Sequence, residues 1–111
     1  MKFECNQDKF KEAISLASRF TSRTHNLPIL QTILLSAIGG EVVIRATNLE
    51  CGVEVVVPAK VATEGVVAVS GSTLGGFVGN LFGEKSLVCR LDGNILRLES
   101  QKAKAALKTF S

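Results

Sequence analysis

The first 19 residues, MKFECNQDKFKEAISLASR (1–19), decide the fold because they join a strand directly to a helix. Residues 1–5 alternate between polar and apolar side chains, which predicts a short strand. Asn6 is a suitable helix N-cap, since its side-chain oxygen can accept a backbone N–H. From Gln7 to about Arg19, apolar residues recur at the i, i+3, i+4, i+7 spacing of one helix face. This predicted buried face consists of Phe10, Ala13, Ile14 and Ala17.

Three strands are expected to follow this helix. Residues 29–37 are apolar enough for a buried strand, and residues 41–47 and 51–57 alternate between apolar and polar side chains. Because proline has no N–H to donate to a ladder, we expect Pro58 to end the last of these strands. The first half of the chain therefore reads as a βαβββ unit.

The second half repeats this order, with a strand at 65–69, a helix capped by Ser72, and strands at 86–91, 95–100 and 104–109. Little residue identity links the halves, so coincidence in a small α+β protein is the alternative to a duplication. We favour the duplication. The expected fold class is α+β, with two amphipathic helices packed side by side on one face of an antiparallel sheet.

The composition fits one compact domain over residues 1–111. Hydrophobic residues make up 46% and charged residues 21%, which argues against disorder. The net charge of +3 permits an anionic partner without requiring one. Neither a signal peptide nor a membrane-length apolar run is visible, so we expect a cytoplasmic protein with no membrane partner.

Residues that carry catalysis or bind metals are sparse. The three cysteines, Cys5, Cys51 and Cys89, have no CxxC spacing, so we expect buried thiols rather than disulfides or a metal site. A single histidine, His25, gives a nucleophile–base pair little to work with. The glycine-rich residues 71–76 lack the Lys-Ser/Thr pair of a phosphate-binding loop, so we interpret them as a helix start. The sequence predicts no enzyme, no metal and no cofactor.

Any nucleic-acid contact is expected to be made to the phosphate backbone. Tyr and Trp are absent, and the six Phe fall mostly on predicted core faces. Proteins that grip single strands usually stack bases on aromatic rings, and proteins that read a duplex project side chains into a groove. Neither set of residues is evident, so binding would be independent of sequence and sensitive to salt.

Several segments taken together resemble the N-terminal domain of the bacterial DNA polymerase III beta subunit, the sliding clamp. They are the opening strand and helix, Leu27-Pro28-Ile29-Leu30, Thr47-Asn48-Leu49-Glu50 and the hairpin Asp92-Gly93-Asn94. The resemblance spans the whole chain and implies the DNA-clamp fold. It implies three such domains per subunit and two subunits joined head to tail around duplex DNA. In the family this ring is a non-catalytic processivity factor.

The resemblance implies further that Ser111 lies near the passage from the first domain to the second. The sites for DNA polymerase and the clamp loader lie toward the last domain, so this chain should lack them. For DNA, the family places a basic residue in the loop after the first helix. That position is Thr24, flanked by Arg23 and His25, and Arg19 and Lys11 could add charge from the helix.

The last strand is the implied contact with the second subunit. In the family, basic and apolar residues there meet an acidic, apolar partner surface. The corresponding residues are Lys102, Lys104, Ala105, Leu107 and Lys108. From the residues alone, an equally good interpretation is that the lysines protect an exposed edge against aggregation.

Because the second helix carries no charge, an alternative function stays open: a stand-alone protein-interaction domain of the clamp fold that never encircles DNA.

Overall fold

The computed structural model describes residues 1–21, 31–48, 51–83 and 85–110. Within these ranges the chain forms two βαβββ units in succession, in the predicted order. The first unit consists of β1 (Lys2–Asn6), α1 (Gln7–Ser18), β2 (Thr32–Ile38), β3 (Glu41–Thr47) and β4 (Gly52–Thr63). The second consists of β5 (Gly65–Ser70), α2 (Gly71–Val78), β6 (Ser86–Asp92), β7 (Ile95–Glu99) and β8 (Lys104–Phe110).

The strands join into one closed antiparallel sheet whose order reveals the duplication. Around the sheet the strands follow β1-β4-β3-β2-β5-β8-β7-β6. Exchanging each strand of one unit for its counterpart in the other leaves this circular order unchanged. The first strand of each unit also pairs with the second strand of the other unit, β1 with β6 and β5 with β2. The predicted duplication is confirmed by this topology.

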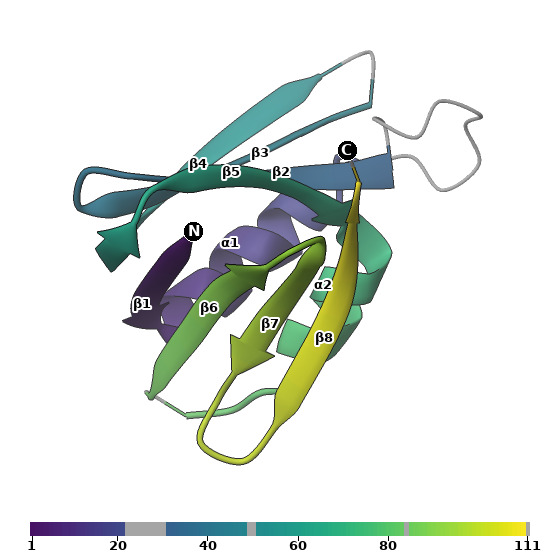
Figure 1. Ribbon diagram of the computed structural model, residues 1–111. Helices are drawn as coiled ribbons and strands as arrows, with labels where there is room; N and C mark the ends of the chain where they lie inside the picture. The colour runs from purple at the N-terminus through teal and green to yellow at the C-terminus, as the bar shows by residue number, and fades with distance from the viewer. Residues whose placement is uncertain (22–30, 49–50, 84, 111) are drawn as a thin grey trace.

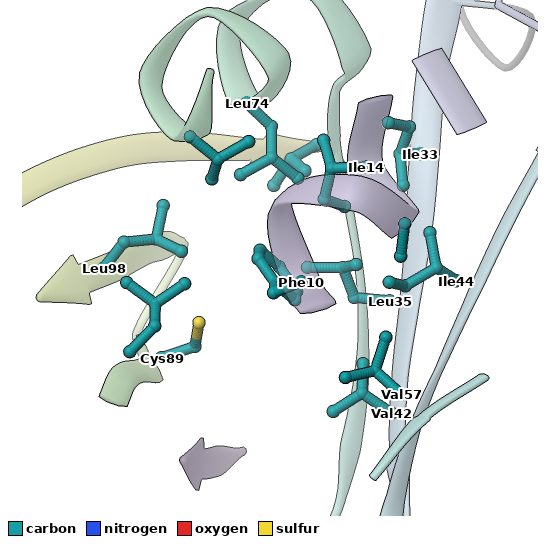
Figure 2. Packing of buried hydrophobic residues seen from close by; sticks show 14 of the residues in the cluster. Phe10, Ile14, Ile33, Leu35, Val42, Ile44, Val57, Leu74, Cys89 and Leu98 are labelled. Atoms are coloured by element: carbon teal, nitrogen blue, oxygen red, sulfur yellow. The ribbon is translucent and has the colours of Figure 1, made fainter. Parts of the chain in front are cut away.

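Both helices lie next to each other on the inner face of the curved sheet, behind β6, β7 and β8 in the view of Figure 1. Figure 2 shows Phe10, Ile14 and Leu74 of the helices pointing into the space between the two sides of the sheet. One side contributes Cys89 and Leu98, and the other contributes Leu35, Val42, Ile44 and Val57. The predicted placement of both helices on one sheet face is confirmed. The closure of the sheet was not predicted.

Each helix starts directly from the strand before it. The side chain of Asn6 accepts the Lys9 N–H at 3.0 Å, as predicted. In the second unit the capping residue is Ser70, whose Oγ accepts the Thr73 N–H at 3.3 Å. The prediction of Ser72 as the cap was wrong because α2 begins one residue after β5 ends, just as α1 begins directly after β1.

Pro58 does not end its strand, contrary to the prediction, because β4 continues to Thr63. The N–H of Ala59 donates to the Gly40 carbonyl at 2.9 Å, on the β3 side. By the two-residue alternation of a strand, the Pro58 nitrogen points away from β3. On that other side β1 pairs with β4 only from Ala59 onward, so no ladder bond requires a Pro58 N–H.

Candidate functional site

The outward surface of the two helices is almost without net charge. On α1, Asp8 and Glu12 balance Lys9 and Lys11, and α2 carries no charged residue. The helices meet through small side chains, since a Cβ built on Gly75 would lie 3.7 Å from the Cβ and Oγ of Ser18. These features leave a smooth polar surface with few side chains standing out from it.

Lys11 fastens α1 to the segment that follows α2. Its Nζ donates to the Leu81 carbonyl at 2.9 Å and lies 4.2 Å from the centroid of the Phe82 ring. Gln7 holds the same segment, because its Nε2 donates to the Phe82 carbonyl at 3.2 Å. The ammonium group of Lys11 therefore has a structural task, and its predicted contact with DNA stays a prediction.

Sequence reasoning missed Phe82, whose side chain is 77% exposed. One signal was available in the sequence. Phe82 is an apolar residue that comes after the second predicted helix and fits neither the spacing of the helix nor the alternation of the next strand. Its ring lies under the Lys11 ammonium, so the two side chains form one exposed unit at the end of the helix pair.

Arg19 is the C-cap of α1 and its side chain is exposed. It lines a shallow groove along α1 together with Lys11, so the structure brings these two predicted DNA-binding residues onto one surface. The other three, Arg23, Thr24 and His25, lie outside the described residues. The motif at residues 27–30 and the last two residues of the motif at 47–50 also lie outside them.

The second candidate site is an open edge of β8. This strand pairs with β7 along residues 104–108, but it pairs with β5 only at Thr109 and Phe110. The Thr109 N–H donates to the Asn94 carbonyl on the β7 side. By alternation, the backbone groups of Lys104, Ala106 and Lys108 point to the open side. A strand from another chain or domain can pair with such an edge.

The side chains of β8 alternate as predicted, with one consequence that was not foreseen. Lys104 and Lys108 are exposed on the outer face, Ala105 is half-buried, and Lys102 is exposed in the preceding turn. Leu107, however, packs in the core of this chain and is only 5% exposed. Most of its side chain is therefore taken up by this chain's own core, and the predicted contact of Leu107 with a second subunit stays a prediction. The exposed residue is Ala106, which the prediction omitted.

A similar open edge occurs on β4, the counterpart of β8 in the first unit. Residues 52–58 pair with β3, whereas β1 pairs with β4 only from Ala59 onward. Alternation from Ala59 turns the backbone groups of Glu54 and Val56 to the open side. The duplication thus gives the molecule two strand edges in equivalent positions.

The cysteines fall into two classes. Cys5 and Cys89 are buried, whereas Cys51 is exposed, contrary to the expectation of three buried thiols. Burial, together with the charge of Glu4, raises the pKa of Cys5 to about 12. Burial, together with Cys5, raises the pKa of Cys89 well above its usual value. Both buried thiols stay protonated at neutral pH and act as small apolar groups.

In the described part of the chain, no three His, Cys, Asp or Glu side chains gather as they would to bind a metal ion. Neither of the helices described is long and apolar enough to cross a membrane.

Comparison with known proteins gives one consistent answer. The family model described as "DNA polymerase III beta subunit, N-terminal domain" matches residues 1–111. The beta sliding clamp of Micrococcus luteus is 30% identical over 110 residues, which cover 99% of this chain and 35% of that protein. The beta sliding clamp of Treponema pallidum is 35% identical over 69 residues, which cover 62% of this chain and 19% of that protein.

Solved structures share the fold. The Caulobacter crescentus pol III beta structure superposes with a TM-score of 0.93 at 22% identity, over 100% of this chain and 30% of that one. The DNA polymerase III subunit beta from Pseudomonas aeruginosa gives a TM-score of 0.92 at 20% identity, with the same coverage. This chain spans about a third or less of the length of each of these four proteins.

Proposed function

The chain belongs to the family of DNA polymerase III beta subunit N-terminal domains, and we propose that it forms one sector of a ring that encloses duplex DNA. The ring holds a replicative polymerase on its template by enclosure rather than by tight binding. The chain contributes no catalysis and needs no cofactor. It works in the cytoplasm, and polymerase and clamp loader bind to other domains of the subunit.

The observation that carries this proposal is the combination of two open strand edges with a helix pair on one face. The edges of β8 and β4 occupy equivalent positions in the two units. Modules of this kind can be joined edge to edge, so that their sheets continue into one another and their helices face the same side. The β8 edge would meet a second subunit head to tail, with Lys104 and Lys108 attracting acidic groups.

The helix surface suits a ring that slides. A surface with little net charge cannot hold a phosphate backbone tightly, and only a few cations remain to attract it. Of the described residues, Arg19 and Lys11 supply this attraction from α1, and we propose that Arg23, Thr24 and His25 also contact the phosphate backbone. Weak contacts that are independent of sequence keep the barrier to movement along the duplex low.

The salt dependence of duplex binding tests the DNA-facing surface. We expect the 111-residue chain to bind duplex DNA weakly, with an affinity that falls steeply as salt rises. Arg19→Gln should reduce the slope of log K against log salt by about 0.9, the value for one lost phosphate contact. The control Arg45→Gln removes an exposed arginine from the outer face of β3 and should leave the slope unchanged. Fluorescence titration at several salt concentrations measures both variants.

An equal loss of slope in both variants would contradict the proposal, as would tight binding that salt does not weaken.

The absence of charge on α2 favours a second candidate, a stand-alone protein-interaction domain of the same fold. That candidate requires no duplex binding through Arg19, so an unchanged slope in Arg19→Gln supports it.

A further inference from the structure

Three cationic side chains form a row across the outer face of β1, β6 and β7. Lys2 lies directly opposite Arg90, and Arg90 lies directly opposite Arg97 in the antiparallel registers. Four residues next to them in sequence are buried in the core, namely Phe3, Cys89, Leu96 and Leu98. Since side chains alternate along a strand, the three cations project from the outer face. We call Lys2, Arg90 and Arg97 the cationic row.

The stability of the sheet does not explain this row. Like charges directly opposite each other destabilise a strand pair, and here two such pairs are consecutive. Arg90 contacts Glu99 at 3.7 Å and Arg97 contacts Asp92 at 3.3 Å, but all four side chains are substantially exposed. Exposed ion pairs contribute little. In the described part of the chain Lys2 forms no ion pair. Residues that act against local stability are often functional.

The cationic row faces away from the helices. In Figure 1 both helices lie behind β6, β7 and β8, and the residues of these strands that face the helices are core residues. On the outer face the positive charge continues onto β8. Arg97 lies opposite the exposed Ala106, and Lys104 and Lys108 flank Ala106 on the same face. The outer face of this sheet is therefore more strongly positive than the helix surface.

We propose that the cationic row binds a carboxylate-rich extended segment of a partner protein. Adjacent strands are about 4.8 Å apart, so the row spans about 10 Å between the backbones of β1 and β7. Side chains on one side of an extended peptide repeat about every 6.7 Å. Two carboxylates on the same side of such a peptide can therefore reach all three cations.

A peptide suits this surface better than a nucleic acid does. The apolar side chains next to the cations on this face are aliphatic, namely Val88, Ile95 and Ala106, whereas single strands usually stack on aromatic rings. Glu4, Asp92 and Glu99 also lie on this face. These fixed carboxylates repel a nucleic acid, because it carries a negative charge at every phosphate. An acidic peptide can instead place its carboxylates opposite the cations and uncharged residues opposite the fixed carboxylates. This inference does not depend on the proposed ring.

Binding of an acidic peptide to the 111-residue chain tests the inference. The probe is a fluorescein-labelled peptide of alternating glutamate and valine, and labelled oligothymidylate of equal charge is titrated in parallel at low salt. We compare Lys2→Gln/Arg97→Gln with the control Lys9→Gln/Arg45→Gln. Each double variant removes one lysine and one arginine, and Arg97 and Arg45 each have one acidic partner. Thermal unfolding verifies that both variants are folded.

We expect the row variant to weaken peptide binding about five- to tenfold and the control to weaken it less than about twofold. Equal weakening in both variants would overturn the inference, because net charge alone would then explain it. Tighter binding of oligothymidylate than of peptide would overturn it in favour of nucleic acid, and a parent chain that does not bind the peptide would refute it outright. A salt slope that Arg19→Gln leaves unchanged contradicts the ring proposal and leaves this inference standing.

Discussion

At the scale of single residues, Lys11 shows how a charged side chain on a helix surface can have a structural role. In the sequence it is one of several charges on the polar face of a helix. In the structure its ammonium group bonds the Leu81 carbonyl and covers the Phe82 ring. These contacts join α1 to the segment that follows α2, so Lys11 links the two halves of the helix pair that carries the proposed DNA-facing surface.

Lys11→Ala should lower the free energy of unfolding by about 1–2 kcal/mol. The substitution removes a charge-assisted hydrogen bond and a cation–π contact, and it leaves the Leu81 carbonyl without this donor. The control Lys9→Ala removes an exposed lysine two residues away and should have almost no effect. Urea denaturation of both variants measures the difference. Equal stabilities would mean that the contacts of Lys11 with Leu81 and Phe82 contribute nothing to the free energy of unfolding.

At the scale of elements, α2 shows why a glycine-rich helix persists. Glycine destabilises a helix interior relative to alanine, yet two of the glycines in α2 meet different surroundings. A Cβ on Gly71 would lie 2.9 Å from Cγ2 of Thr21, whereas a Cβ on Gly76 would have no atom within 4 Å. Of these two positions, close packing therefore requires glycine only at Gly71.

Gly76→Ala should accordingly stabilise the domain by about 0.5–1 kcal/mol, the gain in helix propensity. Gly71→Ala should destabilise it by about 1 kcal/mol or more, because Thr21 must move and its hydrogen bond to the Ser18 carbonyl is disturbed. Chemical denaturation of the matched pair checks the signs. A stabilising Gly71→Ala would show that the close contact with Thr21 relaxes without cost.

The edge of β8 gives a second prediction at this scale. Proline is tolerated where a strand nitrogen points to an open side and disrupts the strand where it points to a partner. Ala106→Pro should therefore leave the 111-residue chain folded, whereas Ala105→Pro should cost about 3 kcal/mol because it removes a bond to β7. In the full-length subunit, Ala106→Pro should convert dimers to monomers in sedimentation. A dimer unaffected by Ala106→Pro would exclude this edge from assembly.

Local sequence patterns predicted the elements better than their ends. The helix spacing of Phe10, Ala13, Ile14 and Ala17 and the alternation in residues 41–47 depend only on neighbouring residues, and both were confirmed. Pro58 and Ser72 were misjudged, because where β4 or α2 begins and ends is decided by partners that are distant in sequence.

At the scale of the whole molecule, the closure of the sheet explains what the sequence could not reveal about the site. Alternation separates the two faces of β8, but it does not say which face packs on the core of this chain. The core takes Leu107, and the outer face keeps Ala106 and the lysines. The open edges likewise depend on which strands fail to meet across the closed sheet, and no local pattern records that.

We propose that the subunit containing these 111 residues stays on DNA because it surrounds the duplex. The direct measurement loads the labelled full-length subunit onto a nicked circular plasmid with its clamp loader, removes unbound protein by gel filtration, and then cuts half of the sample with a restriction enzyme. We expect the subunit to co-elute with the circle and to be released from the linear DNA. Equal retention on circular and linear DNA would contradict it.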